Sequence, residues 1–165
     1  MHESVTVRVA DQPGDLGWMV QQHGEQYAAE FGWDTSFEAL VARIVADFGS
    51  VVDDPRQRGW IAERDGQRVG CILCVSGTDV DTARLRILLV TPEGRGLGVG
   101  RALVDEVVRF AATAGYRRVT LWTNDVLGAA RRIYQDAGFE LVAEEPHHSY
   151  GQDLVGQTWT LDSLA

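Results

Sequence analysis

Four glycines stand at alternate positions in the stretch GRGLGVG, Gly94 to Gly100, between an apolar run and a segment with helical periodicity. The first N–H groups of a helix have no partner within the helix, and the helix dipole adds positive potential at the same end. Glycine allows an anion to approach these amides closely because it carries no side chain. The stretch therefore predicts an anion-binding turn that leads from a strand into a helix.

The glycine spacing argues against two common phosphate-binding motifs. The chain contains no G-x-x-x-x-G-K-[ST] sequence, and the glycines of this stretch do not follow the G-x-G-x-x-G spacing of dinucleotide-binding loops. A nicotinamide-dependent oxidoreductase draws some support from Asn124-Asp125, which end a predicted strand after the glycine-rich loop. The glycine spacing disfavours that interpretation.

The hydrophobic pattern around this turn alternates between helix and strand periods. The residues Asp65-Gly66 are a strong hairpin turn signal within a β-rich segment. The elements expected in chain order are a strand at 5–10, helices at 16–27 and 37–48, strands on both sides of Asp65-Gly66, a strand at 82–90, a helix at 103–111, a strand at 117–123, a helix at 127–137 and strands at 139–145 and 157–164. This order, β-α-α-β-β-β-α-β-α-β-β, predicts a single α/β domain over residues 1–165 with a mixed sheet.

The residues Arg95, Gly98 and Gly100 form the pattern R-x-x-G-x-G, and this motif resembles the pyrophosphate loop of the GNAT superfamily of acyl-CoA-dependent N-acetyltransferases. The likeness continues through LWTNDVLGAARRIYQDAGF, residues 121–139, which is similar to a later strand and helix of that family. Together the motifs cover roughly residues 85–139. The resemblance implies the GNAT acyl-CoA N-acyltransferase fold, whose elements follow the order predicted above.

Two further segments, residues 23–45 and 144–162, are similar to the acetyltransferase halves of bacterial proteins that also carry a MarR-type DNA-binding domain. We expect no such DNA-binding domain in this chain and interpret it as a stand-alone relative.

The resemblance implies acetyl-CoA as co-substrate. Its pyrophosphate suits the amides from Arg95 to Gly100, and its pantetheine arm can pair like a strand with Leu88 to Val90. Asn124 either caps the following helix or contacts cofactor and substrate. The residues expected to bind the cofactor are Leu88, Leu89, Val90, Arg95, Gly96, Leu97, Gly98, Val99, Gly100, Arg101 and Asn124.

Acyl transfer from a thioester needs a neutral amine, a polarised carbonyl and a proton for the departing thiolate. A backbone N–H near Leu89 or Val90 can polarise the carbonyl. Tyr134 occupies the position at which the resemblance implies a catalytic phenol acid, although it also fits a core aromatic residue of the helical stripe. No base stands out among the carboxylates, and ordered water leading to bulk solvent is an alternative acceptor for the amine proton.

The acceptor pocket is expected near the first pair of helices. His23, Tyr27, Phe31 and Trp33 are its predicted walls, with His23 and Tyr27 alternatively core residues of the helical stripe. His147 and His148 are expected in the connection between the last two strands, where one of them binds substrate or moves a proton unless both are simply solvated.

No metal site is predicted. Adjacent histidines without a spaced third ligand make a poor zinc site, and Cys71 and Cys74 would point to opposite faces of a strand.

Composition limits the remaining function classes. The chain has 165 residues, 45% of them hydrophobic, and a net charge of −9, which argues against a broad nucleic-acid surface and mildly favours a cationic amine. No apolar run is long enough to span a membrane, and a cytoplasmic location is expected. The predicted function is transfer of an acetyl group to the primary amine of a small molecule or peptide, and the alternative is a non-catalytic acyl-CoA sensor. A homodimer that pairs the C-terminal strand across a two-fold axis rests on family analogy alone.

Overall fold

Glycine follows two of the helices and completes the hairpin turn that the sequence predicts. In the computed structural model, which describes residues 4–164, Gly115 and Gly138 follow the helices α3 (Val99–Thr113) and α4 (Gly128–Asp136) with φ of 93° and 98°. Asp65 and Gly66 also have positive φ, 52° and 76°, in the two-residue turn between β2 (Arg58–Arg64) and β3 (Gln67–Ser76). Left-handed φ at both central positions is the geometry that favours Asp-Gly in tight hairpins.

The predicted order of strands and helices is confirmed. The other elements are β1 (Val5–Val9), α1 (Asp15–Phe31), α2 (Thr35–Gly49), β4 (Thr82–Val90), the short helix η1 (Pro92–Gly94), β5 (Arg118–Asn124), β6 (Glu140–Ser149) and β7 (Gln152–Leu161).

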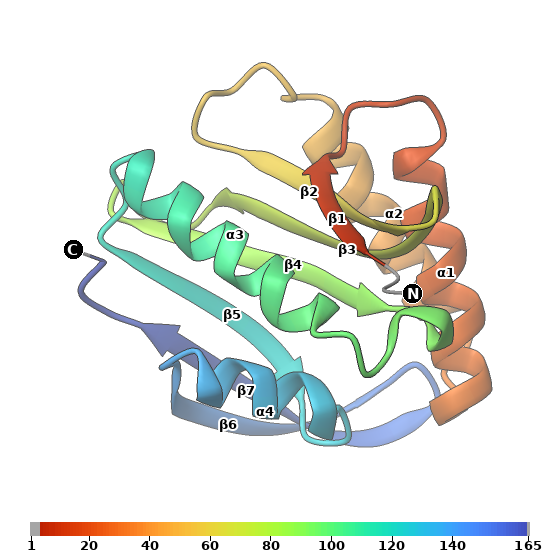
Figure 1. Cartoon of the computed structure of the whole chain (residues 1–165). Coiled ribbons are helices and arrows are strands. Elements are labelled where there is room, and N and C mark those ends of the chain that lie inside the picture. Colours follow the sequence, from red (N-terminus) through yellow and green to blue (C-terminus); the bar gives the residue numbers. More distant parts are fainter. Residues whose placement is uncertain (1–3, 165) are drawn as a thin grey trace.

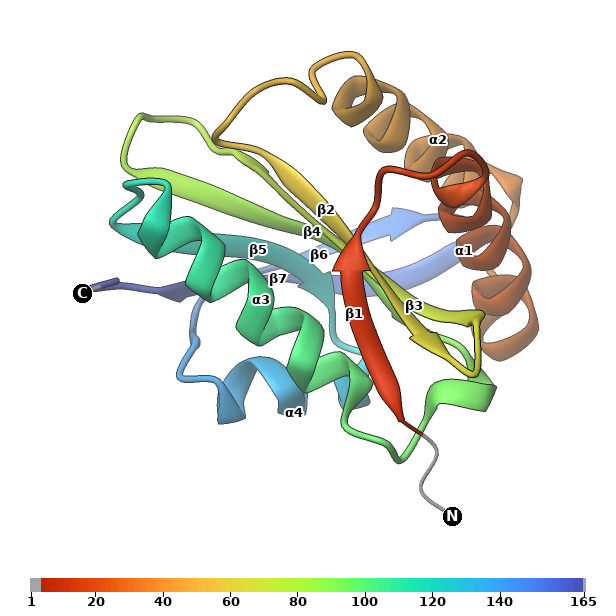
Figure 2. The same ribbon diagram turned by 45° about the horizontal axis from the view of Figure 1, so that its top comes forward.

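The strands form one seven-stranded mixed sheet in the order β1-β2-β3-β4-β5-β7-β6, in which β4 and β5 are parallel neighbours. The helices α1 and α2 cover one face of this sheet, and α3 and α4 cover the other (Figures 1 and 2). Each face has its own hydrophobic cluster. Cys71 belongs to the cluster beside α1 and α2 and Cys74 to the cluster beside α3, so the two buried thiols lie on opposite faces as predicted.

The C-terminal strand is internal to the sheet, which corrects the expected mode of dimerisation. Residues of β7 pair with β5 on one side and with β6 on the other. From Gly156 to Thr160 both edges of β7 are therefore occupied, so this part of the strand is not free to pair across a two-fold axis.

The strand β6 is longer than the sequence suggests. It continues through Pro146, His147 and His148 to Ser149, so the two histidines lie within a strand and not in the connection. That connection is the two-residue turn Tyr150-Gly151, with φ of 57° and 79°. In the sequence, Pro146 predicts the end of the strand. However, β6 lies at the edge of the sheet, where a proline is tolerated because one side of the strand needs no hydrogen-bond donor.

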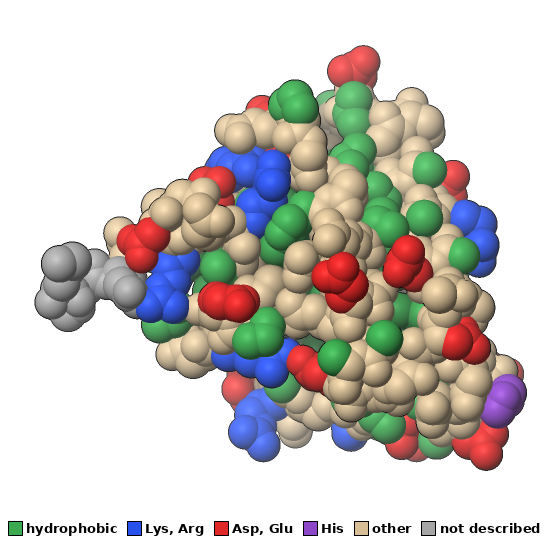
Figure 3. All heavy atoms as spheres, turned by 90° about the vertical axis from the view of Figure 1, so that its right-hand side faces the viewer, with side chains coloured by type: hydrophobic (Ala, Val, Ile, Leu, Met, Phe, Trp, Pro, Cys, Tyr) green, Lys and Arg blue, Asp and Glu red, His purple; other side chains and the backbone are tan. Residues whose placement is uncertain are grey.

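Among residues 4–164, no helix is long and apolar enough to cross a membrane. On the face of the molecule that carries α1, the described acidic and basic side chains are interspersed and do not gather into one basic surface (Figure 3).

Candidate functional site

The parallel strands β4 and β5 separate toward their carboxyl ends. Their pairing covers only Thr82–Arg84 of β4 and Arg118–Thr120 of β5. Beyond that point β4 continues to pair with β3, and β5 pairs with β7. The last residues of β4 therefore have an open edge that faces a gap in the sheet.

A bulge in β4 sets which side chains face this gap. Three residues of β4 advance from Arg86 to Leu89 while β3 moves only from Leu73 to Cys71, so β4 carries one extra residue. Ile87 takes a φ of 49°, which is rare for a β-branched residue. As a result Leu88 packs with the cluster beside α3, whereas Ile87 and Leu89 pack with the cluster beside α1 and α2.

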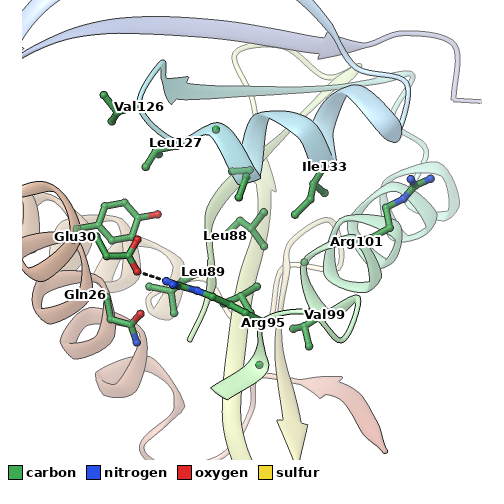
Figure 4. Close-up of a pocket in the computed structure, with 18 of the residues that line it drawn as sticks. Gln26, Glu30, Leu88, Leu89, Arg95, Val99, Arg101, Val126, Leu127 and Ile133 are labelled. Atoms are coloured by element: carbon green, nitrogen blue, oxygen red, sulfur yellow. Dashed lines mark hydrogen bonds and ion pairs between the residues drawn. The ribbon is translucent and has the colours of Figure 1, made fainter. Parts of the chain in front are cut away.

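A first cavity of about 530 Å³ lies at the carboxyl end of β4. Gln26 and Glu30 of α1 flank it on one side and Leu127 and Ile133 on another, with the glycine-rich turn and the start of α3 closing the third (Figure 4). Nine of the residues predicted to bind the cofactor line this cavity: Leu88, Leu89, Val90, Arg95, Gly96, Gly98, Val99, Gly100 and Arg101. Leu97 and Asn124 are not among its lining residues.

The turn before α3 presents a row of unused hydrogen-bond donors. Among the described residues, none of the consecutive backbone N–H groups from Gly96 to Arg101 has a hydrogen-bond partner, and the first intrahelical bond is the one from Ala102 N–H to Gly98 carbonyl. The helix has no side-chain cap at its N-cap residue Gly98. Because the helix dipole adds positive potential here, the turn can bind a diphosphate through its main chain alone.

Glycine is needed in this turn for two different physical reasons. Gly96 and Gly98 take φ of 77° and 74°, and a Cβ at either position would meet nothing within 4 Å, so they bend the chain and leave its amides uncovered. A Cβ at Gly100 would come within 2.6 Å of Cδ1 of Ile133, and one at Gly94 within 2.9 Å of Cβ of Val69. The outer glycines therefore allow close packing, while the inner two shape the anion site.

The two arginines of the turn are held by acidic partners. Arg95 forms an ion pair with Glu30 of α1 across the cavity (Figure 4). Arg101 pairs with Asp105 one helical turn further along, at 2.9 Å. Both side chains are exposed, so a phosphate can replace or share these partners at little cost.

The open edge of β4 also supplies a donor toward the gap. Thr91 N–H donates to the carbonyl of Val69 in the direction of β3. Successive peptide groups of a strand point to opposite sides, so the N–H of Val90 points away from β3. It faces the separation between β4 and β5.

A second cavity of about 450 Å³ lies on the other face of the sheet, between β4 and β5 and the helices α1 and α2. It shares Tyr27, Leu88 and Leu127 with the first cavity. The two cavities thus meet at the gap in the sheet. Three of the four predicted pocket walls, His23, Tyr27 and Trp33, line the second cavity, and Trp33 is 3% exposed. The fourth, Phe31, lines the first cavity.

Tyr134 lies at this junction. It belongs to the hydrophobic cluster beside α3 and α4, yet it lines the second cavity on the opposite face. Its hydroxyl has no hydrogen-bond partner among the described residues. Burial, reinforced by the nearby Tyr27, raises the pKa of Tyr134 well above that of a free phenol. The phenol therefore stays protonated at neutral pH and can donate its proton.

Asn124 lies in the second cavity instead of the first and does not cap α4. The N-cap residue of α4 is Leu127, with no side-chain cap bond. The buried Asn124 accepts a hydrogen bond at its Oδ1 from Nε2 of His147, 2.7 Å away. His147 is in turn held through Nδ1 by the hydroxyl of Ser149 at 2.9 Å. The strand β6 thus fixes Asn124 from outside the cavity.

The other predicted histidine does not reach the site. His148 is exposed and pairs with Asp153 at 2.8 Å. Neither His147 nor His148 lines either of these two cavities, and among the described residues there is no group of side chains that could hold a metal ion.

His23 is a neutral hydrogen-bonding group in the wall of the second cavity. Its Nδ1 donates to the carbonyl of Met19 at 2.7 Å, which leaves a bare lone pair on Nε2. Nε2 is buried and has no hydrogen-bond partner in the described structure. Burial lowers the pKa of His23 to about 4, and the carbonyls of Met19 and Ile87 offset only part of this effect.

No aspartate or glutamate of the described chain lines the second cavity. Glu63 of β2 pairs with Arg8 at 3.3 Å.

Sequence reasoning missed several residues that line this cavity: Phe37, Arg84, Arg86 and Tyr150. The alternation of β4 places Arg84 and Arg86 on one face of a strand whose other residues are apolar, and this was the available signal.

The sequence profile of the acetyltransferase (GNAT) family matches residues 18–139, which include both cavities' central residues. This chain belongs to the GNAT acetyltransferase family. The predicted resemblance is therefore confirmed. The likeness to MarR-fused proteins stays a prediction.

Relatives of this GNAT protein cover it to different extents. An uncharacterized N-acetyltransferase of Schizosaccharomyces pombe is 30% identical over 129 residues, or 75% of each chain. The N-acetylaspartate synthetase of Danio rerio is 38% identical over 85 residues, which are 52% of this chain but only 30% of the zebrafish protein.

Among solved structures, an acetyltransferase of Salmonella typhimurium with its cofactor acetyl-CoA has a TM-score of 0.77 at 18% identity, covering 96% of this chain and 93% of that one. A phosphinothricin acetyltransferase of Sinorhizobium meliloti in complex with AcCoA also has a TM-score of 0.77, at 19% identity, covering 96% and 88%. These structures share the fold of the present chain.

Proposed function

We propose that this protein transfers an acetyl group from acetyl-CoA to the primary amine of a small molecule or peptide by direct attack of the amine on the thioester. The observation that carries this proposal is the meeting of two cavities at the gap between β4 and β5, with unpartnered amides on one side and a protonated phenol at the junction. Its support from related proteins is the family itself and the two acetyltransferase structures described above that contain acetyl-CoA.

The first cavity has the groups that acetyl-CoA binding requires. The amides from Gly96 to Arg101 would hold the pyrophosphate, because their donors are free and no Cβ covers them at Gly96 or Gly98. The open edge of β4 at Leu88 to Val90 would pair with the amides of the pantetheine arm. When bound, acetyl-CoA supplies the activated acetyl group.

The residues at the junction would then act on the acetyl transfer. The N–H of Val90 is directed to the gap and would donate to the thioester carbonyl, stabilising the negative charge that develops as the amine attacks. Tyr134 would give its proton to the departing thiolate, and the attacking nitrogen would lose its proton to water that leads to bulk solvent. Nε2 of His23 would accept a hydrogen bond from the amine and orient it, since a pKa of about 4 makes it a weak base.

The test is release of free thiol from acetyl-CoA over a panel of primary amines, together with calorimetric titration of acetyl-CoA and of NAD. We expect amine-dependent thiol release and binding of acetyl-CoA but not of NAD. Binding of acetyl-CoA without amine-dependent release would instead identify a non-catalytic acyl-CoA sensor. Failure to bind acetyl-CoA would overturn both.

A further inference from the structure

The charged groups that line the second cavity are Arg84 and Arg86, and no described carboxylate faces them there. The two residues are separated by one position of β4, so they lie on the same face of the strand. Neither guanidinium group makes a hydrogen bond or an ion pair with any described residue. Burial and then the neighbouring charge of Arg84 lower the pKa of Arg86, whereas the charge of Asp47 on α2 acts in the opposite direction.

Two arginines elsewhere in the chain have the carboxylate partner that Arg84 and Arg86 lack. Arg8 and Arg68 contact the buried Asp15 at 2.8 and 2.9 Å. A partly buried guanidinium normally finds such a partner, because removing its charge from water costs free energy. Arg84 and Arg86 keep their donors free on a cavity wall, which is the arrangement of an anion-binding site.

The wall opposite these arginines is aromatic. Tyr27 and Phe37 stack at 4.8 Å between ring centroids, and Trp33 and Tyr150 pack at 4.8 Å. Phe37 also meets Trp33 edge to face at 4.7 Å. The rings cover one another's faces and so do not form an open cage for a cation. They offer an apolar surface to the cavity.

We propose that the acceptor is a free amino acid with an apolar or aromatic side chain, whose carboxylate binds Arg86 with help from Arg84. This inference rests on the proposed function and names the acceptor of that reaction. It reverses the expectation of a cationic amine, which was drawn from the net charge of −9. The charge of the whole chain is spread over its surface, whereas the charge that lines this cavity is positive.

The geometry allows the amine and the carboxylate of one small molecule to reach both groups. Leu88 borders both cavities and follows Arg86 by two residues. Two residues of a strand span about 7 Å. An arginine side chain can span this distance back toward the junction. Its planar fork binds a carboxylate through two parallel hydrogen bonds.

The positive cavity also accounts for amine activation without a carboxylate base. A nearby cation disfavours the protonated form of an amine and lowers its pKa. The arginines would therefore increase the fraction of neutral amine at the gap. A polyamine would bring further positive charge into this cavity without any described carboxylate to receive it.

The experiment compares acceptors that differ only in the carboxylate. Thiol release is measured with L-phenylalanine against phenylethylamine, with L-leucine against 3-methylbutylamine, and with spermidine. We expect kcat/KM for each amino acid to exceed that of its decarboxylated partner by about tenfold or more, the effect of about 1.4 kcal/mol of binding.

Variants then assign the effect to the arginine. Arg86→Gln should raise KM for the amino acid about tenfold or more, leave KM for acetyl-CoA unchanged and abolish the preference for a carboxylate; Arg86→Lys should restore part of it. Arg117→Gln is the matched control, since it removes the same charge from an exposed site outside both cavities. Thermal unfolding of each variant checks that it is folded.

Better turnover of the decarboxylated amines or of spermidine would overturn this inference and leave the acetyltransferase function standing. An unchanged carboxylate preference in folded Arg86→Gln would also overturn it, and so would a lack of turnover of every amino acid in the panel while acetyl-CoA still binds. If acetyl-CoA itself fails to bind, the proposed function falls and the inference with it.

Discussion

The two cavities that meet at the gap are built in different ways. The first is shaped by backbone: a bulged strand with an open edge, two glycines at positive φ and the free amides of one helix start, all within residues 86–101. The second is shaped by side chains that come from α1, α2, β4, β5, α4 and the turn after β6. A backbone site suits a co-substrate common to a family, whereas a side-chain site can change its specificity without altering the fold.

Tyr134 stands between the two cavities, and its removal should have the largest effect on rate. Tyr134→Phe keeps the ring and its contact with Phe139, 5.9 Å between centroids, but removes the proton donor. We expect kcat to fall about 100-fold or more, as is usual for loss of a general acid, with little change in the Kd of acetyl-CoA. Single-turnover kinetics and calorimetry measure the two quantities.

The matched control is Tyr116→Phe. Tyr116 is equally buried, and its hydroxyl bonds to the carbonyl of Arg56 at 2.8 Å and to Ser76 at 3.0 Å, away from both cavities. This variant should lose about 1 kcal/mol of stability and keep its kcat. Unchanged turnover in Tyr134→Phe would remove Tyr134 from the mechanism and reduce the junction to packed side chains.

Asp15 shows how an arginine cluster behaves when it is structural. The carboxylate is fully buried and accepts bonds from Arg8, Arg68 and the N–H of Gln12. Asp15→Asn should lower the free energy of unfolding by about 3 kcal/mol, because the partly buried Arg68 loses its carboxylate partner and Arg8 keeps only Glu63. KM for both substrates should stay unchanged. Asp162→Asn, which breaks the exposed pair with Arg118, is the control and should alter stability little.

The same carboxylate gives a pH dependence with a definite sign. Burial opposes ionisation of Asp15, but the bonds from Arg8, Gln12 and Arg68 outweigh it and lower its pKa to about 2, from 3.8. A lowered folded-state pKa stabilises the protein above pH 4, and this contribution is lost as the pH falls toward 2. Denaturant unfolding of the wild type between these values should show the loss, and Asp15→Asn should lack that part of the slope.

A smaller effect is expected from a substitution in the glycine-rich turn of the first cavity. Gly98→Ala places a side chain at φ 74°, where a Cβ meets no atom but the conformation costs about 1–2 kcal/mol. The turn would relax and displace its amides, so the Kd of acetyl-CoA should rise about tenfold. Gly66→Ala has nearly the same φ, 76°, and the same open space in the hairpin between β2 and β3. It should lose similar stability and no affinity; equal losses of affinity would show that the turn before α3 is no special donor site.

The first cavity could be predicted from sequence because its determinants are local. A strand, alternating glycines and a helical stripe follow one another directly, and each has its own signal in residue type and spacing. Nine predicted residues line the cavity for this reason. Leu97 was included only because it lies within the motif, and its side chain is 41% exposed.

The second cavity could not be predicted in the same way, since its walls come from distant segments. The contact of Trp33 with Tyr150 depends on where the turn between β6 and β7 lies relative to α1, and no local pattern gives that. The sequence predicts His147 in a loop that borders the pocket. Because β6 is an edge strand, it continues through Pro146, and His147 contacts Asn124 from outside the cavity. Arg84 and Arg86 carry a sequence signal, alternation on a central strand, but sequence reasoning did not use it.

The smallest effect is expected from His147, which lines neither cavity and acts on the second cavity only through Asn124. His147→Ala removes the donor to a buried amide oxygen, a loss of about 1 kcal/mol, so kcat/KM for the amine should fall about fivefold while KM for acetyl-CoA stays constant. His148→Ala, at the next position but exposed, should change neither value. If His147 works by holding Asn124, the effects of His147→Ala and Asn124→Ala should not add in the double variant. Additive effects would separate the histidine from the amide and show that the second cavity is positioned without help from β6.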